Sequence, residues 1–80
     1  MARNFRAEDE GKRVVTADGD EIGTIEQTAG SMAHVKPSMN LSQSVRRRLG
    51  WAEEGEDTYE LQTAKVDNIG SEEVTLKRNL

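Results

Sequence analysis

Residues 11–36 read GKRVVTADGDEIGTIEQTAGSMAHVK, and this stretch decides the fold. A β-branched run within 12–16 predicts a first strand, and the Asp/Gly turn after it contains Gly19, which can take the positive φ that a tight hairpin needs. A second strand is expected over 21–28 and a third over 32–36, after another turn. The sequence therefore predicts a three-stranded antiparallel meander.

The second strand carries an irregularity. Ile22 and Ile25 stand three residues apart, so a strict period of two cannot place both on one face. Gly23 lies between them and indicates a bulge or a sharp bend. Because bends of this kind curl a sheet, we expect a small barrel or half-barrel.

The spacing of the apolar residues changes after the meander. Leu41, Val45 and Leu49 are spaced four apart within 40–50, which predicts one α-helix with an apolar stripe. Gly50 supplies the C-terminal cap.

The C-terminal part returns to strands. Apolar and polar residues alternate over 59–63 and again around 74–76. Between these strands, a short helical turn over 64–70 is expected to bury Val66 and Ile69. The chain therefore reads as mainly β, a small barrel of five to six strands with one inserted α-helix at about 40–50. Residues 1–10 are expected to be a polar N-terminal tail tethered by Phe5, followed by a single domain over 11–80.

Composition indicates a thin core. Leu, Ile, Val and Phe account for 15 of 80 residues, the net charge is −4 and there is no cysteine. A core of this size seldom contributes more than ~3–5 kcal/mol, and disulfides cannot supplement it, so we expect a homo-oligomer, a dimer or higher. No apolar stretch is long enough for a membrane span, and the acidic balance disfavours nucleic acid. A cytoplasmic protein without direct membrane insertion is predicted.

The sequence contains no residue pattern typical of a catalytic or metal-binding site. His34 is the sole histidine, so neither a catalytic triad nor a histidine-rich metal site can be assembled. The carboxylates at 18–21 are best explained by a hairpin turn, since the further oxygen ligands of a calcium loop are missing. We expect no catalytic residue, no cofactor, no metal and no enzymatic activity.

Two groups of side chains are candidates for contact with other proteins. The first is apolar and is predicted to form a partner or subunit interface: Leu41, Val45, Leu49, Trp51 and Tyr59. The simpler interpretation is that these residues cover the barrel. The second group is basic and would contact an acidic partner: Arg46, Arg47 and Arg48. Its simpler interpretation is complementing the helix dipole and the acidic loop at 53–57.

Two stretches together resemble a known family. GKRVVTADGDEIGTI (11–25) and YELQTAKVDNIGSEEVTL (59–76) resemble the PRC-barrel domain, named for the H subunit of the photosynthetic reaction centre. The helix ending in LGW (49–51) and the acidic loop after it are similar to the short single-domain PRC-barrel proteins of salt-loving archaea.

The resemblance implies a five- or six-stranded adaptor barrel. Similar haloarchaeal proteins associate with one another and with SepF, the membrane anchor of the FtsZ division ring. We therefore expect a scaffold protein of archaeal cell division, recruited to the division site, with a related PRC-barrel protein and SepF as partners. The alternative that the family offers is an RNA-associated or ribosome-maturation accessory protein.

Overall fold

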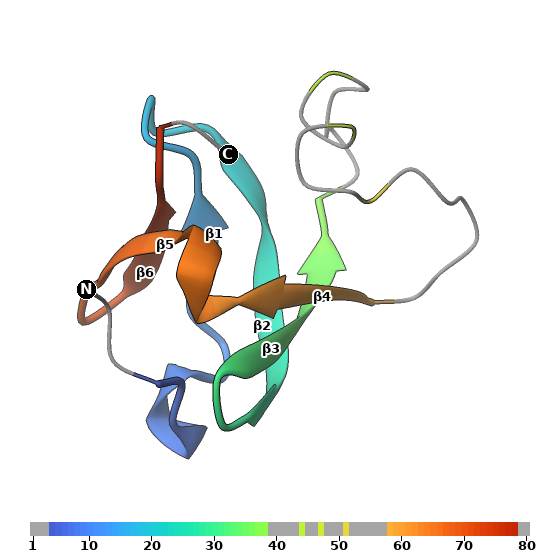
Figure 1. The fold of residues 1–80 in the computed structure, drawn as a ribbon, viewed down its shortest axis with the longest axis vertical. Helices are drawn as coiled ribbons and strands as arrows, with labels where there is room; N and C mark the ends of the chain where they lie inside the picture. The colour runs from blue at the N-terminus through green and yellow to red at the C-terminus, as the bar shows by residue number, and fades with distance from the viewer. Residues whose placement is uncertain (1–3, 39–43, 45–46, 48–50, 52–57, 79–80) are drawn as a thin grey trace.

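The protein is built on one sheet of six strands. The computed structural model describes residues 4–38, 44, 47, 51 and 58–78. The elements in chain order are η1 (Ala7–Asp9), β1 (Arg13–Val15), β2 (Glu21–Ala29), β3 (Met32–Pro37), β4 (Tyr59–Gln62), η2 (Thr63–Lys65), β5 (Val66–Ile69) and β6 (Glu73–Leu76), where η denotes a 3₁₀ turn. The strand order is β4-β3-β2-β1-β6-β5 (Figure 1). Neighbouring strands are antiparallel except for β1 and β6, which pair in parallel.

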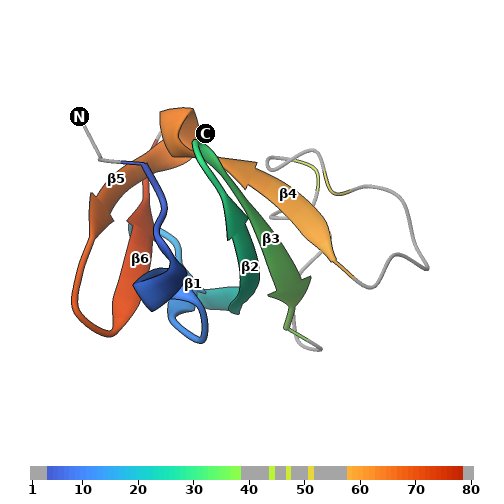
Figure 2. The same ribbon diagram turned by 90° about the horizontal axis from the view of Figure 1, so that it is seen from below.

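The sheet must curl because its two end strands are consecutive in the chain. In a flat sheet of six strands the end strands, β4 and β5, would lie roughly 24 Å apart. The chain crosses from Gln62 to Val66 through η2 alone, and four residue steps span at most about 14 Å. The sheet therefore bends until β4 and β5 meet at η2 (Figures 1 and 2). The result is a half-barrel, which confirms the predicted small, mainly β fold.

The predicted bulge in the second strand is confirmed. Val14 pairs with Gly23 and Val15 with Glu21, which leaves Ile22 as the extra residue. The extra residue lets Ile22 and Ile25 both be buried despite their odd spacing. A Cβ on Gly23 would overlap the Lys36 carbonyl oxygen and lie 2.7 Å from Cγ1 of Val35, so the close approach of β2 to β3 requires glycine here.

The helical turn predicted over 64–70 is wrong in its second half. Only 63–65 form a helical turn, and Val66–Ile69 is the edge strand β5. Val66 pairs with Leu76 and Ile69 with Val74, and a register shift lies between Val66 and Asn68. A spacing of three fits both a helical turn and a bulged strand. Pairing with the neighbouring strand β6 stabilises the bulged strand.

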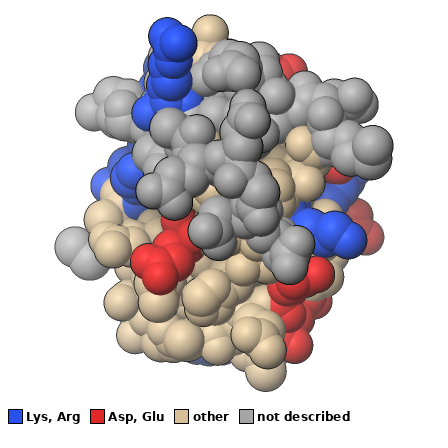
Figure 3. All heavy atoms as spheres, turned by 90° about the vertical axis from the view of Figure 1, so that its right-hand side faces the viewer, with Lys and Arg blue, Asp and Glu red and all other residues tan. Residues whose placement is uncertain are grey.

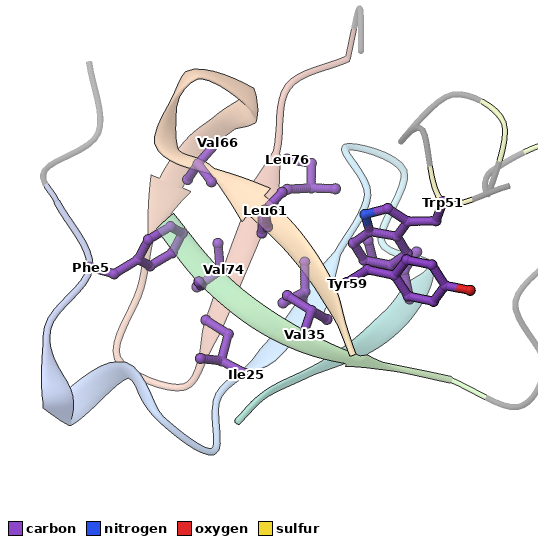
Figure 4. Packing of buried hydrophobic residues seen from close by; sticks show 12 residues of the cluster. Phe5, Ile25, Val35, Trp51, Tyr59, Leu61, Val66, Val74 and Leu76 are labelled. Atoms are coloured by element: carbon purple, nitrogen blue, oxygen red, sulfur yellow. The ribbon is translucent and has the colours of Figure 1, made fainter. Parts of the chain in front are cut away.

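The segment predicted to be an N-terminal tail belongs to the folded unit from residue 4 onward. Phe5 is 5% exposed, and its backbone N–H donates to the Gly30 carbonyl at 3.0 Å. The segment runs between the β5–β6 hairpin and the β2–β3 hairpin (Figure 2), and the Phe5 ring lies on the side of Val66 and Val74 (Figure 4). The predicted domain boundary at residue 11 therefore falls inside the structure.

The core lies inside the curl of the sheet (Figure 4). Its members come from every strand, from the N-terminal segment and from Trp51: Phe5, Val14, Ile22, Ile25, Ala33, Val35, Trp51, Tyr59, Leu61, Val66, Val74 and Leu76. Most of the helix predicted over 40–50 lies outside the described residues. Ser44 and Arg47 are described, and both are helical and exposed.

Candidate interaction surface

The first candidate surface is the edge of the sheet formed by β4. The rings of Trp51 and Tyr59 stack there, with centroids 5.2 Å apart and planes inclined by 16°. Trp51 Nε1 donates a hydrogen bond to the Glu60 carbonyl at 3.2 Å. Figure 4 shows the two rings side by side at the end of the core nearest to β4.

The register explains why this carbonyl is available to Trp51. The Thr63 N–H donates to the Ser31 carbonyl at 2.9 Å, which makes these two residues a hydrogen-bonded pair of the β3–β4 ladder. Such pairs alternate along antiparallel strands, so the backbone groups of Glu60 point away from β3. The indole N–H of Trp51 therefore donates to a carbonyl that points outward from the edge strand β4. An edge that is covered in this way is less able to pair with another chain.

The predicted interface residues are only partly brought together. Trp51 and Tyr59 touch, but they are 3% and 8% exposed, so as they stand they offer a partner little surface. Leu41, Val45 and Leu49 lie outside the described residues. Their interface role stays a prediction.

The predicted basic contact is described at one position. Arg47 is exposed, as a contact with an acidic partner would require. Arg46 and Arg48 lie outside the described residues, so the grouping of the three arginines is still a prediction.

A buried ion pair between η1 and the start of β1 was not predicted. Asp9 is fully buried, and its Oδ1 accepts a hydrogen bond from Lys12 Nζ at 2.7 Å while its Oδ2 accepts one from the Arg6 N–H at 2.8 Å. Lys12 Nζ also donates to the Gly70 carbonyl at 2.8 Å. We call Asp9, Lys12 and Gly70 the latch, because they tie η1 and the start of β1 to the β5–β6 turn. A charged pair three residues apart in a polar stretch carries no signal of burial, which is why sequence reasoning missed it.

An open depression of about 430 Å³ lies beside the latch. Its lining comes from η1, the start of β1 and the end of β5: Glu8, Lys12, Ile69, Gly70 and Ser71. Ile69 is half-buried and packs against the core from this side. The depression therefore combines the apolar side chain of Ile69 with the charged side chains of Glu8 and Lys12.

His34 and the carboxylates near residue 20 are the side chains that the sequence offered for catalysis or metal binding. His34 is half-buried on β3, with Gln27 and Glu60 as its cross-strand neighbours. The carboxylates near residue 20 belong to the predicted hairpin turn, in which Gly19 has φ +93° and its N–H donates to the Thr16 carbonyl. Within the described part of the chain, no three His, Asp or Glu side chains are grouped so that they could hold a metal ion.

The surface on the side of β3 and β4 is mixed in charge. Figure 3 shows acidic and basic side chains of the described residues interspersed with uncharged ones on this face. None of the helices among the described residues combines the length and the apolar character that crossing a membrane would take.

Together these features define a small half-barrel of six strands in which an aromatic pair covers the β4 edge and a buried ion pair ties η1 to the β5–β6 turn. The chain belongs to a family of unknown function, DUF8593, whose model matches residues 5–76. The match begins at Phe5 and ends at Leu76, which are also the first and last core residues of the described chain. Comparison with curated proteins gives no significant match, and neither does comparison with solved structures.

Proposed function

We propose that this protein is a non-catalytic adaptor that acts by binding other proteins. The observation that carries the proposal is the open sheet: among the described residues β4 and β5 each pair with a single strand, and the chain joins the two at η2. Strand edges present unused backbone donors and acceptors, and proteins commonly use them to join with other chains. A half-barrel with two edges of different character suits a scaffold role.

A narrower form of the proposal draws on the PRC-barrel resemblance of 11–25 and 59–76. In this form the protein self-associates, as a dimer or higher, and takes part in archaeal FtsZ-based cell division with a related PRC-barrel protein and SepF as partners. The exposed Arg47 supports a contact with an acidic partner surface.

Self-association is tested by size-exclusion chromatography with light scattering over a range of concentrations. We expect a mass above that of one chain at micromolar concentration, and a monomer throughout this range would contradict self-association. Trp51→Ala is the informative variant: because Trp51 is buried within one chain, we expect stability to fall while subunit number stays the same.

The cellular role is tested by co-precipitation of the tagged protein from a haloarchaeal lysate. Division proteins, SepF among them, are expected to be enriched over ribosomal proteins. Enrichment of ribosomal proteins alone would contradict the division role and favour the RNA-associated alternative.

A further inference from the structure

Residues 4–10, which we call the strap, join the tips of two hairpins that are distant in the chain (Figure 2). At the β2–β3 turn, the backbone N–H of Phe5 donates to the Gly30 carbonyl at 3.0 Å. At the other hairpin, the latch connects Asp9 of the strap to the β5–β6 turn. Phe5 is 5% exposed and Asp9 is fully buried. The strap therefore has a defined docking surface on the rest of the chain.

The strap is also held in shape by hydrogen bonds of its own. The Arg6 N–H donates to Asp9 Oδ2 at 2.8 Å, and the Asp9 N–H donates to the Arg6 carbonyl at 2.9 Å. The Glu10 N–H donates to the Ala7 carbonyl at 3.1 Å. Because these bonds lie within the strap, the same folded unit can dock on its own chain or on a second copy. The chemistry that fits the docking surface is thus the chemistry of the strap itself.

The connection between the strap and β1 is short and depends on one glycine. Glu10 is extended, with φ −63° and ψ 135°, and Gly11 then has a φ of +90°. The Gly11 N–H donates to the Ile25 carbonyl at 2.7 Å, which fixes Gly11 to β2. A change of backbone conformation at Glu10 and Gly11 would turn the strap outward. Short hinges of this kind favour the exchange of an element between copies.

We propose that two copies of this protein associate by exchanging their straps. Phe5 of each copy then fills the core of the other, and the latch forms between Asp9 of one copy and Lys12 of the other. Each docking surface is filled in both arrangements, so the exchange leaves no buried group without a partner. This inference rests on the proposed self-association and names the segment that carries it.

The first test is cross-linking of the full chain, which has no cysteine of its own. Glu8→Cys in the strap and Ser71→Cys in the β5–β6 turn replace two exposed residues that line the same depression. A short bismaleimide joins the two thiols at micromolar protein concentration, and denaturing electrophoresis separates one chain from two. We expect a covalent dimer as the main product, because exchange places the strap of one copy beside the turn of the other.

A second cysteine pair is the matched control. Arg13 and Glu73 face each other across β1 and β6, and both follow the hinge in the chain. Strap exchange leaves this pair within one chain. Arg13→Cys combined with Glu73→Cys should therefore give only cross-links within single chains under the same conditions.

Matched glycine variants test the hinge by light scattering. Gly11 and Gly19 both have open space for a Cβ and nearly the same φ, +90° and +93°. Valine is strained at either position, but only at Gly11 would strap exchange open the turn and relieve the strain. We expect Gly11→Val to lower the concentration at which half of the chains are paired by at least about tenfold. Gly19→Val should leave that concentration unchanged.

A longer hinge should have the opposite effect. Insertion of Gly-Ser-Gly after Glu10 lets the strap fold back on its own chain without strain, so we expect a shift toward the monomer. This variant adds no strain to the fold and provides a test even where Gly11→Val fails to fold.

The inference is overturned if the cross-links between residues 8 and 71 stay within one chain, if Gly11→Val and Gly19→Val change assembly equally, or if the longer hinge leaves assembly unchanged. These outcomes are distinguishable from failure of the proposed function. An oligomer whose cross-links stay within single chains keeps self-association and removes strap exchange. A strict monomer removes the self-association on which the exchange rests.

Discussion

The meander β1–β2–β3 and the closing half of the barrel, β5–β6 with the N-terminal segment, are held together differently. In the meander each strand pairs with the next one along the chain through a short turn. In the closing half, β6 pairs in parallel with β1, and the Arg13–Glu73 contact joins residues 60 positions apart. Phe5 and the latch then hold the closing half in place.

The two halves are therefore vulnerable to different changes. Closing a long loop costs more chain entropy than closing a hairpin, so the distant pairing needs extra contacts to offset that cost. The buried latch and the Phe5 ring are such contacts. The meander, in contrast, depends on two turns and on one glycine that allows the strands to approach closely.

The largest expected effect breaks the meander at Gly23. Gly23→Val would place side-chain atoms against the Lys36 carbonyl and Val35, so we expect a loss of about 3 kcal/mol or more and a chain largely unfolded at room temperature. Circular dichroism with urea titration measures it. Gly30→Asn is the control, because Gly30 has open space and a φ of +60° that asparagine tolerates. Equal losses in both variants would contradict the steric explanation.

The next effect breaks the closing half at the latch. Asp9→Ala leaves the largely buried Lys12 ammonium without its charge partner, and we expect a loss of about 2–3 kcal/mol in the free energy of unfolding. Asp67→Ala, which removes an exposed carboxylate from β5, should change stability by less than about 0.5 kcal/mol. A result in which Asp9→Ala is as mild as Asp67→Ala would show that the ion pair does not hold the closing half.

A matched pair of smaller changes tests which of the two halves folds first. Val35 in the meander and Val74 in the closing half are both fully buried, and each Val→Ala change is expected to cost about 1.5–2.5 kcal/mol. Stopped-flow kinetics should separate them: Val35→Ala slows folding, because the local meander forms early, and Val74→Ala mainly speeds unfolding. If Val74→Ala slows folding and Val35→Ala mainly speeds unfolding, the β1–β6 pairing forms before the meander.

The smallest effect concerns the exposed ion pair across β1 and β6. Nη2 of Arg13 and Oε2 of Glu73 are 3.5 Å apart, and about half of each side chain is exposed. Arg13→Ala should therefore lower the free energy of unfolding by less than about 0.5 kcal/mol, and added salt should abolish the difference. A loss above about 1 kcal/mol, measured by thermal unfolding at low and high salt, would mean that this surface contact closes the barrel.

Local patterns predicted the meander well because its determinants are local. The turn around Gly19 and a bulge beside Gly23 follow from residue chemistry alone, and both are observed, the bulge at Ile22. The segment 66–69 shows where local patterns stop. Its apolar residues fit a helical turn as well as a bulged strand, and only the presence of β6 decides between the two.

The candidate surfaces were less predictable for a related reason. Trp51 and Tyr59 were predicted as two of five interface residues, but their burial and stacking depend on how β4 lies on the core. Asp9 and Lys12 gave no sequence signal, because a short charged spacing is ordinary on a protein surface. Their role comes from Gly70, which reaches them only when the barrel closes.

Local sequence sets the mainly β class, the hairpin turns and the position of the bend, since these depend on backbone preferences of single residues and on alternation between neighbours. Contacts between distant segments decide that the N-terminal segment forms η1 beyond the expected tether at Phe5, that 66–69 is an edge strand and that a buried ion pair ties η1 to the β5–β6 turn. The physical reason is distance along the chain: a buried charge or an edge strand is stable only beside partners that folding brings from far away.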